Sequence, residues 1–125
     1  MKRMGEWKRL LRSFGHAVEG INYTIKTQRN MQIHVGAAVA ALLLCWLLDV
    51  TWIHALLVFF SIFFVFILEI INTAIEATVD LVTTDFHPLA KAAKDAAAGA
   101  VLLGAIMAIL VGIYVFLDPI LQVLN

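Results

Sequence analysis

The sequence predicts an all-α membrane protein, built from one amphipathic surface helix and three membrane-spanning helices. The chain has 125 residues, 62% of them hydrophobic, and its mean hydropathy is +0.93. Soluble domains are only about half apolar. The charged residues gather in a few segments, and three long uncharged stretches lie between them. A chain of this length holds one small domain, so residues 1–125 are treated as a single unit.

The N-terminal segment predicts the surface helix, at about residues 5–28. Its apolar residues recur at intervals of three and four, which marks one face of a helix: Trp7, Leu10, Leu11, Phe14, Val18, Ile21 and Ile25. The other side is mainly basic, and helices of this kind usually lie in the membrane interface. Gly15 and Gly20 weaken the helix. So much positive charge on an apolar protein favours an anionic membrane surface or a phosphate-bearing ligand over nucleic acid.

Three spans are predicted at about residues 30–48, 52–82 and 90–117. The gaps from Arg29 to Asp49 and from Asp49 to Glu69 each hold 19 uncharged residues, counting histidine as neutral. As helix they measure about 28 Å, close to the thickness of the bilayer core. The third gap, Ala96–Leu117, holds 22 uncharged residues and can span with some tilt.

The third span carries a small residue at every fourth position, which lets helix backbones approach closely in lipid: Ala96, Ala100, Gly104, Ala108 and Gly112. Three helices alone can bury carboxylates only incompletely, so we expect an oligomer. Every Lys and Arg lies in the N-terminal segment or in residues 83–95. The positive-inside rule therefore predicts a cytoplasmic N-terminus and an external C-terminus.

The end of the second span carries a polar stripe. In "EIINTAIEATVD" (69–80), Glu69, Asn72, Glu76 and Asp80 fall within about 80° of one another on a helix, together with Thr83. A solvated helix end explains Asp80 and partly Glu76. It explains Glu69 poorly, because an unpaired charge between "FVFIL" and "II" is costly. Carboxylates seven residues apart can divide two tasks, proton acceptance from a membrane substrate and binding of a hard divalent cation.

The segment "TTDFHPLAKAAKDAAAGAV" (83–101) follows. Pro88 predicts the start of a new helix, with Lys91 and Lys94 in its first turns. Alone these lysines would be solvated anchors, but beside the stripe they can neutralise phosphate oxygens. The sequence has neither a G-x-x-x-x-G-K-[ST] loop nor a kinase-type glycine-rich loop.

The stretches "EIINTAIEATVDLVT" and "HPLAKAAKDAAAGAV" resemble the prokaryotic diacylglycerol kinase family, most of all its Gram-positive branch, whose members phosphorylate undecaprenol. The resemblance runs from the region of Arg9 to the third span. It implies a homotrimer in the bacterial inner (cytoplasmic) membrane, with active sites shared between neighbouring subunits at the cytoplasmic face. It also implies ATP as co-substrate and Mg²⁺ as cofactor.

Roles follow from the resemblance, residue by residue. Glu69 matches the catalytic base, which deprotonates the lipid hydroxyl. The positions implied for ATP binding are Arg9, His16, Gln28, Glu76, Asp85, Phe86, His87, Lys94 and Asp95. The metal is expected at Gln28 and Glu76, and the positions that support the site or meet the substrate are Arg9, Asn72, Asp80 and Ala98. The family has glutamate where Gln28 stands, and an amide oxygen brings no charge to the metal. His16 stands where some relatives have tyrosine.

The leading hypothesis is ATP- and Mg²⁺-dependent phosphorylation of undecaprenol to undecaprenyl phosphate. The same catalytic residues allow the phosphorylation of diacylglycerol to phosphatidic acid. A small ion channel or carrier that uses Glu69 is a distant alternative. It would require polar residues at mid-depth in several spans, where this chain has only Ser61.

Overall fold

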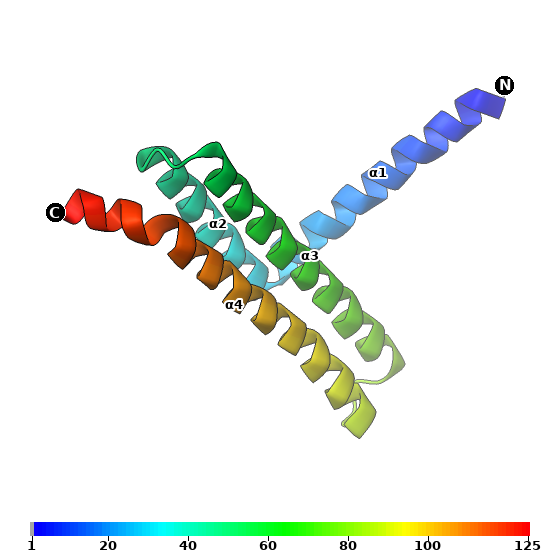
Figure 1. The fold of residues 1–125 in the computed structure, drawn as a ribbon. Helices are drawn as coiled ribbons and strands as arrows, with labels where there is room; N and C mark the ends of the chain where they lie inside the picture. Colours follow the sequence, from blue (N-terminus) through cyan, green and yellow to red (C-terminus); the bar gives the residue numbers. More distant parts are fainter. Residues whose placement is uncertain (1) are drawn as a thin grey trace.

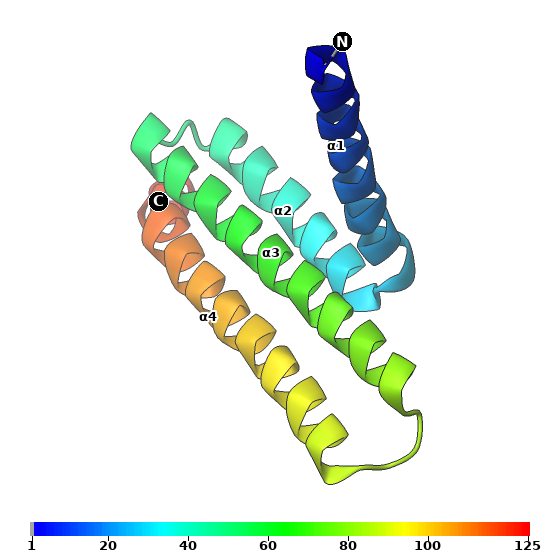
Figure 2. The same ribbon diagram turned by 90° about the vertical axis from the view of Figure 1, so that its right-hand side faces the viewer.

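The computed structural model describes residues 2–125, and their side chains from residue 5 onward. It contains four helices in chain order: α1 (Lys2–Thr27), α2 (Arg29–Leu47), α3 (Trp52–Val82) and α4 (Pro88–Leu124). Helices α2, α3 and α4 run side by side as a bundle, and α1 leaves the bundle at a steep angle (Figures 1 and 2). The prediction of an all-α chain is confirmed.

Helix α1 is continuous through Gly15 and Gly20. The side chains of its described part are mostly exposed, including Trp7 at 65% and Phe14 at 63%. Thr24 is the exception, at 2% exposed, and its hydroxyl donates to the Gly20 carbonyl oxygen at 3.1 Å. Helix α1 therefore meets the bundle near its C-terminal end, and its large apolar residues from Trp7 to Ile21 are not covered by this chain.

Helices α2, α3 and α4 have 19, 31 and 37 residues, and all three are long and apolar enough to cross a membrane. At about 1.5 Å per residue α3 measures about 46 Å, longer than the hydrocarbon layer is thick. Many large apolar side chains on these helices stay exposed, for example Trp46 at 77% and Trp52 at 76%. Such a surface requires lipid or another protein chain to cover it, which agrees with a multi-pass membrane protein.

A tight turn joins α2 to α3. Asp49 has a positive φ of 50°, in the left-handed region that aspartate tolerates better than most residues. The next backbone N–H, of Val50, donates to the Cys45 carbonyl oxygen at 3.2 Å. Thr51 then caps α3, its hydroxyl oxygen accepting from the His54 N–H at 3.4 Å. The turn falls between the two predicted spans, where Asp49 interrupts the apolar sequence.

Helices α3 and α4 pack closely at Gly104, where an added Cβ would lie 2.5 Å from Leu68 Cδ1. Gly104 is buried, and Ala108 and Gly112 are half-buried. Ala96 and Ala100, in the same row of small residues, are exposed. The row therefore serves the contact between α3 and α4 only along part of its length.

Helix α4 begins at Pro88 and extends to Leu124, beyond the predicted span of 90–117. Pro119 lies inside the helix. Proline removes one backbone donor and crowds the carbonyl four residues earlier, here that of Val115. Helix α4 bends toward its C-terminal end (Figure 1), as an internal proline explains.

Candidate functional site

The polar stripe of α3 runs from the interior of the bundle to the solvent. Glu69 is 1% exposed and Asn72 is 5% exposed. Glu76 is half-buried, and the side chain of Asp80 is 52% exposed. Because α3 is unbroken over this segment, all four residues lie on one continuous helix. The stripe thus connects a buried position to an exposed one.

Glu69 lies in a cavity of about 270 Å³ between three helices. The cavity is lined by Asn30, Ile33 and His34 of α2, by Glu69, Asn72 and Glu76 of α3, and by Ala98, Val101, Leu102 and Ala105 of α4. Both carboxylate oxygens are buried and accept no hydrogen bond from the described residues. A buried polar group without a partner is costly. Its oxygens are therefore available to a substrate donor.

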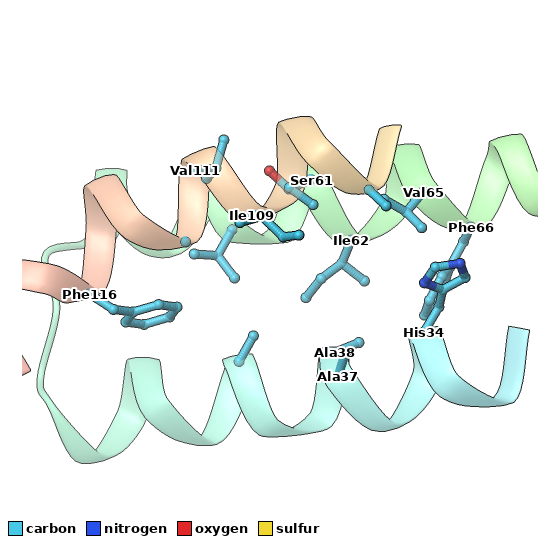
Figure 3. Close-up of a pocket in the computed structure, with 15 residues that line it drawn as sticks. His34, Ala37, Ala38, Ser61, Ile62, Val65, Phe66, Ile109, Val111 and Phe116 are labelled. Atoms are coloured by element: carbon cyan, nitrogen blue, oxygen red, sulfur yellow. The ribbon is translucent and has the colours of Figure 1, made fainter. Parts of the chain in front are cut away.

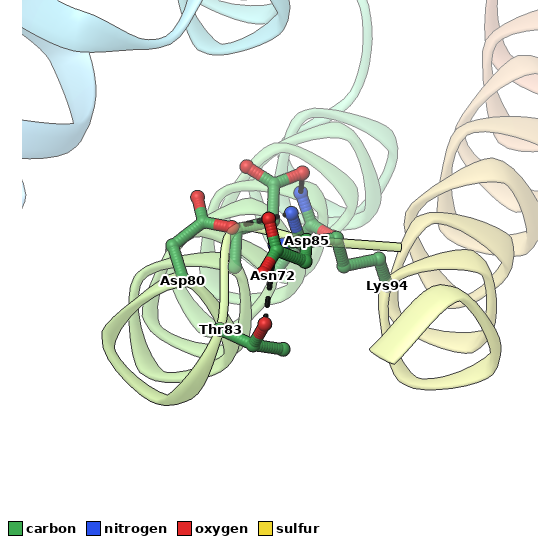
Figure 4. A network of polar contacts seen from close by, with 6 residues as sticks. Asn72, Asp80, Thr83, Asp85 and Lys94 are labelled. Carbon is green, nitrogen blue, oxygen red and sulfur yellow. Dashed lines mark hydrogen bonds and ion pairs between the residues drawn. The ribbon is translucent and has the colours of Figure 1, made fainter. Parts of the chain in front are cut away.

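Asn72 and Glu76 form a polar pair one turn further along α3. The Asn72 amide nitrogen donates to Glu76 Oε1 at 3.2 Å, and Asn72 Oδ1 is buried without a partner among the described residues (Figure 4). Carboxylate and amide oxygens are the ligands that Mg²⁺ prefers. The donor chemistry at this point therefore fits a hard divalent cation.

Gln28, the other expected metal ligand, lies at the corner between α1 and α2. It precedes the first residue of α2, with its backbone N–H donating to the Thr24 carbonyl oxygen at 2.9 Å. Gln28 does not line the Glu69 cavity. Over the described part of the chain, no three His, Cys, Asp or Glu side chains form a group that could hold a metal. The expected pair of Gln28 and Glu76 stays a prediction.

The two lysines of early α4 are both ion-paired. Lys94 Nζ lies 2.5 Å from Asp80 Oδ1, which joins α4 to the exposed end of the stripe (Figure 4). Lys91 Nζ lies 2.5 Å from Asp95 Oδ2, one turn along the same helix. The structure thus brings Asp80 and Lys94 together.

The segment between α3 and α4 borders a second cavity, of about 600 Å³. Asp85, Phe86 and His87 all line it, although Lys94 and Asp95 do not. The Asp85 N–H donates to the Thr83 hydroxyl oxygen at 3.1 Å, and His87 Nδ1 accepts from the Leu89 N–H at 3.1 Å. His87 is therefore the N-cap of α4.

Arg9 and His16 lie on α1, which points away from the bundle (Figure 2). Both are exposed, and neither lines the Glu69 cavity. His16 Nδ1 lies 3.5 Å from Glu19 Oε2 on the same helix. The structure of one chain therefore does not bring these two expected ATP-binding residues to the stripe.

The sequence analysis missed His34. Its Nε2 lies 3.6 Å from Glu69 Oε2. It also stands at one end of an apolar cavity of about 360 Å³ between α2, α3 and α4 (Figure 3). His34 and Ala105 line both cavities, so the apolar space adjoins the one that holds Glu69. The sequence did contain a signal for it: His34 is a polar side chain inside an apolar span, and ionisable residues in such spans usually have a function.

Comparison with known proteins identifies the family of this chain. The family model described as "Prokaryotic diacylglycerol kinase" matches residues 15–116. An undecaprenol kinase of Bacillus subtilis is 48% identical over 112 residues, covering 90% of this chain and 91% of the relative. A diacylglycerol kinase of Synechocystis is 45% identical over 116 residues, which is 92% of this chain and 66% of that longer protein. The Escherichia coli K12 diacylglycerol kinase is 35% identical over 103 residues, covering 82% of this chain and 84% of the relative. The chain therefore belongs to the prokaryotic diacylglycerol kinase family.

Proposed function

We propose that this protein is a lipid kinase that transfers the γ-phosphate of ATP to undecaprenol, giving undecaprenyl phosphate and ADP. The observation that carries the proposal is the position of Glu69. It is a buried carboxylate with no hydrogen bond from the described residues, beside an apolar cavity and at the dry end of a polar stripe. The undecaprenol kinase of Bacillus subtilis, 48% identical, supports the choice of substrate.

In this mechanism the lipid hydroxyl enters from the bilayer and Glu69 accepts its proton. The hydroxyl oxygen forms a bond to the γ-phosphorus, and the bond from that phosphorus to the β–γ bridging oxygen breaks. ADP leaves with the electron pair of the broken bond. Positioning and electrostatic stabilisation account for most of the catalysis in phosphoryl transfer. The burial of Glu69 contributes to this positioning, because few water molecules can compete with the lipid hydroxyl for its carboxylate oxygens.

Phosphate charge is neutralised at the wetter end of the stripe. Glu76 and Asn72 would hold Mg²⁺, with Gln28 as a further ligand, and the bound ion would neutralise charge on the transferring phosphate. Lys94 would exchange its contact with Asp80 for a phosphate oxygen. We assign the remaining nucleotide contacts to Arg9, His16, Asp85, Phe86, His87 and Asp95, and a substrate-facing position to Ala98.

The active protein in this proposal is a homotrimer whose sites are shared between neighbours. Arg9, His16 and Gln28 do not line the Glu69 cavity in one chain, and in this proposal a neighbouring subunit would supply them. The exposed apolar faces of the three spans are available for such contacts. The amphipathic α1 would lie on the cytoplasmic surface of the bacterial inner membrane, and the C-terminus would lie outside, as the distribution of Lys and Arg favours.

Diacylglycerol is the second candidate substrate. It is favoured by the diacylglycerol kinases of Synechocystis and Escherichia coli, at 45% and 35% identity. The groups that carry the chemistry, Glu69 and the Asn72–Glu76 pair, act on a hydroxyl and a phosphate, and either lipid alcohol supplies the hydroxyl. The choice between the two substrates therefore rests on the apolar surfaces that receive the chain of the lipid.

The test is transfer of labelled γ-phosphate from Mg-ATP to undecaprenol and to diacylglycerol, side by side in one detergent. The Glu69→Gln variant is the control for background transfer. Faster transfer to undecaprenol supports the proposal, and faster transfer to diacylglycerol replaces it with the second candidate. A folded protein that phosphorylates neither lipid contradicts both.

A further inference from the structure

We propose that His34 is a positioning residue for Glu69: its imidazole engages one carboxylate oxygen and leaves the other to face the lipid hydroxyl. This inference rests on the proposed function, in which Glu69 accepts the proton of the lipid. It gives a role to a residue of α2 in the cavity that holds Glu69 of α3.

The geometry singles out this pair. His34 Nε2 lies 3.6 Å from Glu69 Oε2, with the His34 side chain 20% exposed and that of Glu69 1% exposed. The cavity around Glu69 has one other carboxylate on its walls, Glu76, on the same helix as Glu69. The α4 residues that line it are all apolar: Ala98, Val101, Leu102 and Ala105. Two residues of α2 on this wall carry a side-chain nitrogen, Asn30 and His34. Asn30 makes no hydrogen bond to the buried Glu69 oxygens, whereas His34 Nε2 lies 3.6 Å from one of them.

The chemistry of a neutral imidazole suits this task. With its proton on Nε2, the ring donates to Oε2 and restricts rotation of the carboxylate. The separation of 3.6 Å is longer than a hydrogen bond, and catalytic contacts commonly shorten when the substrate binds. Holding Oε2 in this way directs Oε1 toward the incoming hydroxyl. A carboxylate that is free to rotate would spend part of its time out of reach of that proton.

The position of His34 between two cavities gives the contact a further consequence. The ring forms part of the wall of the apolar cavity and also contacts the base (Figure 3). Since the two spaces meet at His34 and Ala105, a lipid that fills the apolar one brings its polar end to the same ring. His34 therefore couples the seating of the lipid to the orientation of Glu69.

Two substitutions at His34 distinguish a positioning role from a packing role, because the two roles predict opposite orders of activity for the two variants. His34→Leu keeps an apolar wall and removes the donor, whereas His34→Gln keeps an N–H near the place of Nε2. If His34 positions the base, kcat falls by about tenfold to a hundredfold in His34→Leu, the cost expected of a misplaced catalytic group. His34→Gln then retains most of the rate, and the KM for ATP stays unchanged in both variants.

His54 offers the matched control. It also lies in the apolar part of a span, but its ring packs edge-on against Tyr114, with ring centroids 5.4 Å apart, and it does not line the Glu69 cavity. His54→Leu and His54→Gln should leave kcat near that of the unsubstituted protein. An equal loss in the two His34 variants, or a better rate in His34→Leu than in His34→Gln, overturns the positioning role.

A second measurement does not depend on activity. The ¹⁵N resonances of the His34 ring are recorded in the full-length protein without substrate, and again in Glu69→Gln and Glu19→Gln. We expect a shift in Glu69→Gln and none in Glu19→Gln, and an unchanged spectrum in Glu69→Gln overturns the contact. If the unsubstituted protein phosphorylates neither lipid, the proposed function fails, while the spectra still decide whether His34 engages Glu69.

Discussion

Lys94 of α4 and Asp80 of α3 form an ion pair across the exposed end of the proposed site, with 2.5 Å between Nζ and Oδ1. The side chains are 39% and 52% exposed. Ion pairs in contact with solvent contribute only about 0–1 kcal/mol to stability. The contact therefore serves mainly to hold the ammonium group at the end of the stripe, where it can be exchanged for a phosphate oxygen at small cost.

Replacing Lys94 by methionine should reduce kcat/KM for ATP by about a hundredfold, because a charge that stabilises the transferring phosphate is lost. Lys91→Met is the matched control, one turn earlier on α4, where the side chain is 63% exposed and pairs with Asp95. It should have a much smaller effect. Steady-state kinetics with varied Mg-ATP measure both. Equal losses in the two variants would show that Lys94 has no special contact with phosphate.

Replacing Glu69 by glutamine should lower kcat by about 10²–10⁴-fold, the usual contribution of a general base. The fold should survive, since the Glu69 oxygens accept no hydrogen bond from the described residues and glutamine has nearly the same shape. Turnover at saturating substrates and elution volume on size exclusion check the two halves of this prediction. Glu19→Gln, on the exposed face of α1, provides the control. Activity close to that of the unsubstituted protein in Glu69→Gln would remove the base assignment.

Helix positions were predictable because span length and charge are local properties of the sequence. Asp49 separates two uncharged stretches of 19 residues, and the structure turns at that residue. Pro88, with its fixed φ and missing donor, predicted the start of α4, which begins there. The far end of α4 was not predictable, because the helix tolerates Pro119 with a bend instead of ending before it.

Contacts between helices were harder to predict from the sequence. The row of small residues indicates close packing but not the partner, and only its part from Gly104 onward faces the bundle. The stripe on α3 was predictable because helical periodicity alone puts its members on one face. His34 was missed because its relation to Glu69 depends on how α2 packs beside α3, and no local pattern encodes that packing.

Replacing Gly104 by leucine should destabilise the contact between α3 and α4. Even a Cβ would lie 2.5 Å from Leu68 Cδ1, so the larger side chain must displace Leu68 and separate the helices. Overpacking of this kind costs about 1–3 kcal/mol. Gly99→Leu, on the same helix with no atom of this chain within 4 Å of the added Cβ, is the control. The fraction folded in a denaturing-detergent titration measures the difference. Equal midpoints for the two variants would contradict close packing at Gly104.

Replacing Gln28 by glutamate should lower the Mg²⁺ concentration required for the half-maximal rate. Glutamate adds a negative charge at this position, and a carboxylate binds a hard cation more strongly than an amide oxygen does. The substitution changes only the binding of the metal ion, so the KM for the lipid should not change. Initial rates over a Mg²⁺ titration, at fixed ATP and lipid, measure the effect.

Gln32→Glu is the control for that substitution, because it makes the same chemical change one turn further along α2. Gln32 is exposed, and its amide donates to the Ile25 carbonyl oxygen at 3.1 Å instead of reaching the stripe. We expect no change in its Mg²⁺ dependence. If Gln28→Glu also leaves the Mg²⁺ dependence unaltered, Gln28 is no metal ligand, and the ion would be held by Glu76 and Asn72 without it. If both variants lower the Mg²⁺ requirement equally, a general increase in negative charge explains the effect, and the specific role of Gln28 is wrong.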